Sequence, residues 1–140
     1  MSQVRYGVVA VVVRPEVPDA RFLVIRRSQT VRSPGKYCFP GGSIEPGESE
    51  EAAVVREFWE ELGAAIIPRE RLWQSLTVTN VKLAWWLVEL LPEQTIVPNH
   101  LEVESVHWLT SDEVLAMPDL LASNRDFYAA WRQGDFRLPQ

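Results

Sequence analysis

The segment Ser49–Leu62 restricts the fold more than any other part of the chain, because its acidic and apolar residues separate onto opposite sides of a helix. At about 100° per residue, Glu57, Glu60 and Glu61 fall within a single arc of about 100°. The opposite side carries the apolar residues Ala52, Val55, Phe58, Trp59 and Leu62. Ser49 is a good N-cap and Gly63 a natural residue to end a helix. We therefore predict a helix over Ser49–Leu62 that buries one face against a core.

The acidic side of this helix calls for a chemical explanation. Carboxylates three and four residues apart repel each other and destabilise a helix by a few tenths of a kcal/mol per pair. Arg56 is the only basic residue in the segment. A divalent cation would turn the repulsion into coordination, because hard cations take carboxylate oxygens and complete their shell with water and phosphate. The alternative is a solvated surface that binds nothing.

The rest of the chain alternates predicted strands and helices. We expect strands at Val4–Arg14, Phe22–Arg27, Tyr37–Phe39, Leu72–Thr79, Leu83–Leu91 and Val103–Leu109, the second as a hairpin partner of the first. Asn80 is expected in the turn between two of them. A short helix capped by Ser111 or Asp112 should end before Pro118, and a last helix should cover Asn124–Arg132. This order predicts an α/β or α+β fold with a mixed sheet, formed by one domain over residues 1–140.

Composition excludes several classes of protein. The 140 residues suit one globular domain, and the net charge of −5 disfavours a basic nucleic-acid binder. A single cysteine, Cys38, excludes an internal disulfide and a cysteine-based zinc site. No apolar run is long enough to cross a bilayer, so we expect no membrane partner and a cytoplasmic protein. Residues 1–40 are rich in bases and residues 41–64 in acids, which suits a ligand that combines phosphate with a cation.

A fixed spacing of residues surrounds the predicted helix. From Gly42, the chain places Glu48 after five residues and Arg56 after seven more, followed by Glu57-Phe-Trp-Glu-Glu-Leu-Gly63-Ala64. This pattern resembles the Nudix box of the Nudix hydrolases, G-x5-E-x7-R-E-U-x-E-E-x-G-U, and matches all of its fixed letters. Phe58 and Ala64 depart from the bulky aliphatic residues usual at two positions. The lead-in from Gly35 through Phe39 also looks like the family's approach to the box.

The resemblance implies a Nudix fold, in which a mixed β-sheet is sandwiched between helices. It also implies hydrolysis with Mg²⁺ or Mn²⁺ of a nucleoside diphosphate linked to another group. The metal ligands that it suggests are Glu57, Glu60, Glu61 and the backbone carbonyl of Gly42. Glu61, or a glutamate in a downstream loop, would act as the base toward the attacking water, and Arg56 would orient the acidic cluster by ion pairing, with Glu48 as a candidate partner.

Further candidates lie outside the box. We predict that Arg27 and Lys36 bind substrate phosphate, with plain surface charge as the alternative. Glu102 is preferred to Glu104 as the additional catalytic acid.

The tryptophans, the cysteine and the histidines also have structural interpretations. Trp85 and Trp86 must face opposite sides of a strand, so one belongs to the core and the other is available to stack on a base. Cys38 is interpreted as a small filler residue, and His100 and His107 as structural or surface residues.

Two classes of function remain at this stage. The first is a metal-dependent hydrolase of a small-molecule nucleotide, and the second is a catalytically silent Nudix-fold module that senses a nucleotide or binds a protein. Retention of three mutually repelling glutamates favours the enzyme. The sequence leaves the substrate open: a nucleoside triphosphate fits, and Arg27-Ser28, Arg32 and Gly35 echo part of a pattern found in coenzyme A-cleaving relatives. It also leaves open the number of metal ions and the oligomeric state, a homodimer being one option.

Overall fold

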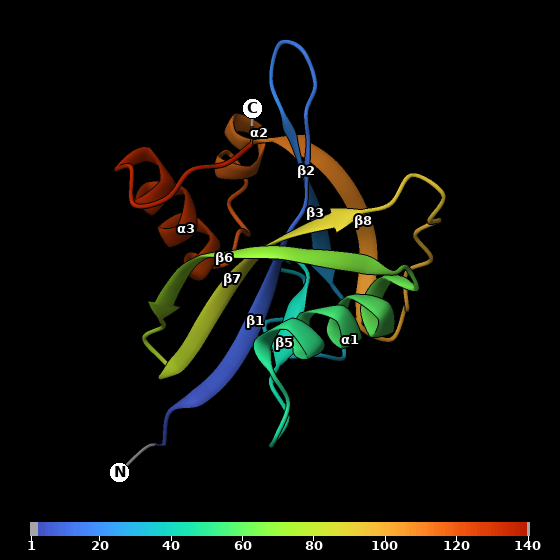
Figure 1. Cartoon of the computed structure of the whole chain (residues 1–140), viewed down its shortest axis with the longest axis vertical. Helices are drawn as coiled ribbons and strands as arrows, with labels where there is room; N and C mark the ends of the chain where they lie inside the picture. The colour runs from blue at the N-terminus through green and yellow to red at the C-terminus, as the bar shows by residue number, and fades with distance from the viewer. Residues whose placement is uncertain (1–2, 140) are drawn as a thin grey trace.

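A computed structural model describes residues 3–139, which form two four-stranded sheets and three helices (Figure 1). The first sheet has the order β5 (Gly41–Ser43), β1 (Arg5–Val11), β7 (Val81–Leu90) and β6 (Ile66–Leu76). The second joins β2 (Val13–Arg14), β3 (Arg21–Arg27) and β4 (Tyr37–Cys38), with β8 (Val103–Thr110) on the other side of β3. The helices are α1 (Glu50–Leu62), α2 (Ser111–Leu115) and α3 (Ala122–Arg132).

Strand β1 lies inside the first sheet and is apolar on both faces. It pairs parallel with β7 and antiparallel with β5, so this sheet is mixed, as predicted. Val8 packs with one core cluster and Val9 with another, because successive side chains of a strand point to opposite faces. The near-continuous valine run of β1 therefore supplies two cores at once.

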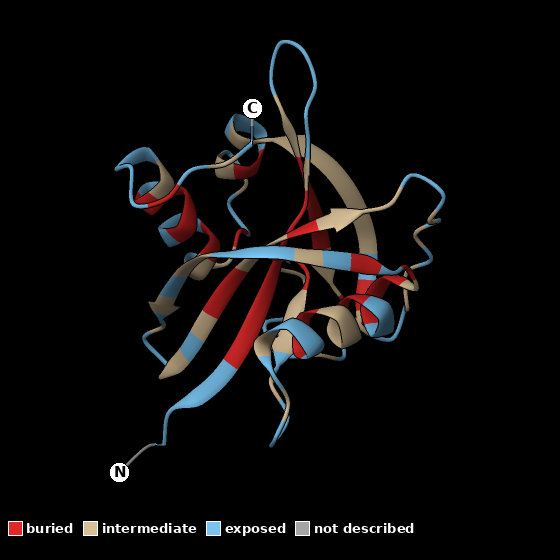
Figure 2. Cartoon of the chain, in the orientation of Figure 1, coloured by how far each residue is buried: buried red, intermediate tan, exposed pale blue. Residues whose placement is uncertain are grey.

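Helices α1 and α3 cover opposite faces of this sheet. Phe58 and Leu62 of α1 belong to the cluster that contains Val8, and Phe127 and Tyr128 of α3 belong to the cluster that contains Val9. Figure 2 shows the buried residues of β1 and β7 between the two helices. The predicted arrangement of a mixed sheet between helices is confirmed. None of the helices within residues 3–139 is long and apolar enough to cross a membrane.

The ends of α1 agree with the sequence, but other expectations need correction. Ser49 caps α1 by accepting a hydrogen bond from the Ala52 N–H at 3.1 Å, and Gly63 ends it in the left-handed conformation with φ 61°. The short helix α2 is capped by Thr110 rather than by the expected Ser111 or Asp112, because Thr110 and Glu113 form a reciprocal capping box.

The strand pairing also differs from the expected hairpin. The predicted strand Val4–Arg14 is divided, and only Val13 and Arg14 pair with β3, because β1 continues into the first sheet and β2 into the second. Strand β6 begins at Ile66, six residues before the predicted start, although its first residues include Pro68.

Candidate active site

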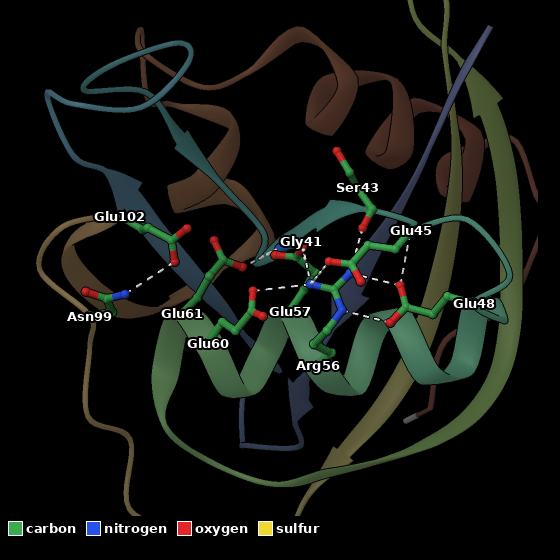
Figure 3. A network of polar contacts seen from close by, with 10 residues as sticks. All are labelled: Gly41, Ser43, Glu45, Glu48, Arg56, Glu57, Glu60, Glu61, Asn99 and Glu102. Atoms are coloured by element: carbon green, nitrogen blue, oxygen red, sulfur yellow. Dashed lines mark hydrogen bonds and ion pairs between the residues drawn. The ribbon is translucent and has the colours of Figure 1, made fainter.

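Arg56 is the centre of an ion-pair network on the acidic side of α1 (Figure 3). Its Nε and Nη2 donate to the two carboxylate oxygens of Glu48 at 2.7 and 2.9 Å. Its Nη1 donates to Glu57 at 3.0 Å and to Glu60 at 3.2 Å, and its Nη2 also donates to the Ser43 carbonyl at 2.9 Å. These bonds lower the pKa of Glu48 to about 2 and raise the pKa of Arg56. The arginine therefore ties the loop before α1 to two of the three glutamates predicted as metal ligands.

Glu61 has a different environment, although it belongs to the same acidic arc. Its side chain is buried, with 5% of the residue exposed, and it accepts a hydrogen bond from the Gly41 N–H at 2.9 Å. Burial, reinforced by the neighbouring charges of Glu57 and Glu102, raises the pKa of Glu61 to about 8. The alternative of a solvated acidic face therefore does not hold for Glu61, because α1 packs this edge against the segment at β5.

Glu57 lies between these two extremes and explains why position 42 is glycine. Burial raises the pKa of Glu57, while the hydrogen bond and charge of Arg56 lower it. A Cβ atom on Gly42 would overlap the Glu57 carboxyl group. A side chain at position 42 would therefore push this carboxylate out of its place.

Glu102 reaches the acidic cluster from the loop before β8. Its charge acts on both Glu57 and Glu61, and Asn99 donates to its carboxylate at 3.5 Å. The same Asn99 donates its backbone N–H to the Glu61 carbonyl at 2.8 Å, which joins this loop to the last turn of α1. Glu104 instead pairs with Arg26 at 3.1 Å. Of the two candidate glutamates, Glu102 is the one near the cluster.

The donor set fits a divalent cation, although its side chains are not gathered around one point. Among residues 3–139, no three His, Cys, Asp or Glu side chains converge closely enough to hold a metal ion as they lie. Glu57 and Glu60 point toward Arg56 and are hydrogen-bonded to it (Figure 3). The carboxylates of Glu61, Glu57 and Glu102 are neighbours, and together they offer hard oxygen ligands suited to Mg²⁺ or Mn²⁺. A bound cation would relieve the repulsion among these carboxylates.

A cavity of about 350 Å³ opens beside this cluster. The residues around it come from β1, the end of β3, the segment from β4 to β5, the turn before β7 with the start of that strand, and the first turn of α3. They include Gly7, Val9, Arg27, Phe39, Gly41, Gly42, Leu83 and Asn124. Gly7 lies at this cavity, and a side chain at this position would be crowded, because a Cβ there would be 3.0 Å from the Leu83 side chain. Gly41 and Gly42 thus line the cavity on one side and lie against the acidic cluster on the other. The Gly41 N–H donates to Glu61, and Gly42 packs against the Glu57 carboxyl group.

The cavity includes one of the two predicted phosphate-binding residues. Arg27 lines it, donates through Nε to the Arg32 carbonyl at 2.6 Å, and lies close enough to Glu61 to lower its pKa in part. Lys36 is not among the lining residues.

The two tryptophans lie elsewhere. Trp85 is a fully buried core residue, and Trp86 donates its indole N–H to Glu50 at 2.9 Å. Neither lines the cavity, so base stacking by Trp86 in this cavity is not supported.

Asn124 is a site residue that sequence reasoning missed. It is 2% exposed, accepts a hydrogen bond from the Phe39 N–H at 3.3 Å, and lines the cavity. Its Nδ2 has no hydrogen-bond partner among residues 3–139, which is costly for a buried amide. The residue lies 85 positions from Phe39 in the chain. In the sequence it is only the first residue of a predicted helix, and that position gives no signal of a place in a cavity.

A scan against family models matches the NUDIX domain over residues 4–131. The chain belongs to the Nudix family. The spacing from Gly42 to Ala64 is therefore a Nudix box, and two of its glutamates, Glu57 and Glu61, lie next to the glycines that border the cavity just described.

Several known proteins are similar to this Nudix domain. A MutT-like protein of Streptomyces ambofaciens is 35% identical, over 77% of this chain and 65% of its own length. The 8-oxo-dGTP diphosphatase of Escherichia coli is 41% identical, over 47% of this chain and 54% of its own length. The solved MutT protein of Methanosarcina mazei Go1 is 28% identical, with a TM-score of 0.73 over 95% of this chain and 96% of that one. The chain thus spans only about half to two thirds of these curated relatives.

Proposed function

We propose that this Nudix domain hydrolyses the diphosphate bond of a small-molecule nucleotide with the help of Mg²⁺ or Mn²⁺. The observation that carries the proposal is the buried carboxylate of Glu61 beside the glycine backbone that borders the cavity. A buried carboxyl group with a perturbed pKa in a cleft is a functional-site candidate, because a purely structural role would favour a paired or solvated group.

Each residue of the site has a role in this proposal. Glu57, Glu60, Glu61 and the Gly42 carbonyl would hold the cation, which supplies charge neutralisation at the diphosphate and a water of lowered pKa. Arg56 positions Glu57 and Glu60 through its hydrogen bonds. Glu61 or Glu102 accepts the proton of the attacking water, and Arg27 donates to a phosphate oxygen at the edge of the cavity.

The nucleoside occupies the cavity, and Asn124 contacts its base. The free N–H groups of Asn124 Nδ2 require an acceptor, and a ring or carbonyl atom of a base supplies one. The first turn of α3 adds backbone donors on the same side, with no side-chain cap and no acidic residue among them. This end of the cavity therefore favours a base edge rich in acceptors. The relative named 8-oxo-dGTP diphosphatase agrees with a purine nucleoside triphosphate as one substrate to test.

A panel of nucleotides incubated with Mg²⁺ or Mn²⁺ tests the proposal, with the phosphate products separated by chromatography. We expect turnover of at least one nucleotide, loss of turnover in EDTA, and recovery when either metal is restored. Full activity after exhaustive chelation would contradict the role of the metal.

The panel also tests the alternative of a silent module. Tight nucleotide binding, measured by calorimetry, without any turnover would indicate a sensing or protein-interaction domain. An Asn124→Ala variant sharpens the result, because it should reduce kcat/KM without changing the response to metal.

A further inference from the structure

We propose that the cavity accepts a nucleotide with a second phosphate group on its ribose, and that Arg5 binds this phosphate. The inference rests on the proposed function for the orientation of the nucleotide, and it adds the class of substrate. It concerns the end of the cavity farthest from the acidic cluster, to which the catalytic proposal assigns no role.

The charge of the cavity is the first observation. Arg5 and Arg27 both line it, and no Asp or Glu does. Neither arginine has an ion-pair partner within the described residues, in a chain with more acids than bases. The arginines that do pair with carboxylates in residues 3–139 are Arg21, Arg26, Arg56, Arg69, Arg71 and Arg132. The two cavity arginines are therefore available to anions from outside the chain.

The two arginines lie at different ends of the cavity. Arg27 acts on the charge of Glu61, whose carboxylate is bonded to Gly41, and Gly41 pairs with Val9 of β1. Arg5 precedes Val9 by four residues on the same strand, a distance of about 13 Å along an extended chain. Because side chains alternate along a strand, Arg5 and Val9 lie on the same face of β1. One diphosphate held beside Glu61 cannot also occupy the Arg5 end.

Arg5 is held at the rim but keeps free donors. Its backbone N–H donates to the Asn80 carbonyl at 3.0 Å, and its Nη2 donates to the Thr79 carbonyl at 3.4 Å. A guanidinium has five N–H donors, so most of them remain for a ligand. When the 5′ diphosphate lies at Arg27 and the base at Asn124, the 2′ and 3′ oxygens of the ribose are the positions left for a group that reaches Arg5. A phosphate there matches the guanidinium in charge and geometry.

Two pairs of nucleotides test the proposal, each differing only in one ribose phosphate. The first pair is ADP-ribose with and without a 2′-phosphate, and the second is coenzyme A and its form without the 3′-phosphate. We expect the phosphorylated member of at least one pair to have a kcat/KM about tenfold higher, the scale of a charge-assisted hydrogen bond. Arg5→Gln should reduce this ratio to about one and leave the other member of the pair unchanged.

Lys82→Gln is the matched control, because it removes one positive charge from the adjacent strand. Lys82 is exposed and follows Val81, a residue that lines the cavity, so its side chain points to the other face of the sheet. It should leave the ratio as in the wild type. An equal decrease in both variants would indicate long-range attraction and overturn the proposal.

Calorimetry separates this proposal from the catalytic one. Adenosine 2′,5′-bisphosphate and 3′,5′-bisphosphate are compared with adenosine 5′-monophosphate, using the whole chain and no turnover. Tighter binding of one bisphosphate, lost in Arg5→Gln, supports the Arg5 site even if no nucleotide is hydrolysed. Equal affinities for all three nucleotides, together with kcat/KM ratios near one, overturn it while leaving the hydrolase proposal intact.

Discussion

Two glutamates of the Nudix box, Glu48 and Glu61, show how one residue type serves two purposes in the same motif. Glu48 lies in the loop before α1 and receives both prongs of the Arg56 guanidinium, which lower its pKa to about 2. Glu61 lies in the last turn of α1, is buried without a cation bonded to it, and has a pKa raised to about 8. The first carboxylate is neutralised by the protein, and the second is left for something else to neutralise.

The difference follows from where each available cation is used. Arg56 contacts Glu48 in the loop before α1 and Glu57 and Glu60 on the helix, but it forms no ion pair with Glu61 within the described residues. Arg27 acts on Glu61 only through space, because its Nε is bonded to the Arg32 carbonyl. The single N–H of Gly41 offsets only part of the cost of burial. A buried charge without a partner is unfavourable, and perturbed groups of this kind cluster at functional sites.

The largest expected effect is on catalysis, when the unpaired carboxylate of Glu61 is changed. Glu61→Gln should lower kcat by at least about a hundredfold, because a neutral amide neither binds the cation well nor accepts a proton. The fold should survive, since a glutamine oxygen can still accept the Gly41 N–H and an uncharged group suits burial. Steady-state kinetics and a thermal melt measure both effects. Glu51→Gln, an exposed change in the first turn of the same helix, is the control, and equal kcat values for the two variants would refute the assignment.

A somewhat smaller effect is expected at Arg27, the cation nearest the unpaired carboxylate. Arg27→Ala should lower kcat/KM by about tenfold to a hundredfold, the range for a charge-assisted contact. If the two-pronged geometry matters, Arg27→Lys will restore little of this loss, whereas restoration of most of it would indicate a point charge. Arg32→Ala removes an exposed charge from the same loop but keeps the carbonyl that holds Arg27, so it should change kcat/KM by less than about twofold. A similar loss in Arg32→Ala would remove Arg27 from the site.

A change at Glu48, the carboxylate paired with Arg56, should act mainly on the positions of the other glutamates and on stability. Glu48→Gln removes one charged partner of Arg56, which frees the arginine to shift away from Glu57 and Glu60. We expect about a tenfold loss in kcat, the lower end for partners that orient metal ligands, together with a lower thermal midpoint. Glu45→Gln is the control, because Glu45 is 3.7 Å from Arg56 and mostly exposed. If Glu48→Gln melts like the wild type, the network does not stabilise the loop.

The contrast between Glu48 and Glu61 also shows which features could be predicted from the sequence and which could not. The bounds of α1 were predictable because Ser49 and Gly63 act locally, through a cap bond three residues away and a left-handed turn. The angle of Glu61 on the helix was equally predictable. Its burial was not, because that depends on the segment at Gly41, twenty residues away, which packs against that edge.

Long-range pairing limited the prediction of the fold in the same way. Two apolar strands joined by a proline turn predict a hairpin, but β1 pairs in parallel with β7, more than seventy residues later in the chain. The buried Asn124 is likewise defined by its contact with Phe39. The predicted bounds of α1, which rested on local chemistry, were confirmed, whereas the predicted hairpin, which depended on the neighbour across a sheet, was incomplete.

The smallest expected effect is a pH dependence of stability with opposite signs at the two ends. Between about pH 4.5 and 8, the unfolded chain releases the Glu61 proton that the metal-free folded protein retains, so stability should fall as the pH rises. Below about pH 4.5, Glu48 takes up a proton in the unfolded chain but stays ionised in the folded protein. Stability should therefore fall as the pH drops toward 2. The thermal midpoint in EDTA should therefore be highest near pH 4.5 to 5. Glu61→Gln should flatten the upper limb, and Mg²⁺ should raise the midpoint more at pH 8 than at pH 5, because it binds ionised carboxylates. An upper limb that is unchanged in Glu61→Gln would show that Glu61 is ionised without metal, and the contrast with Glu48 would then disappear.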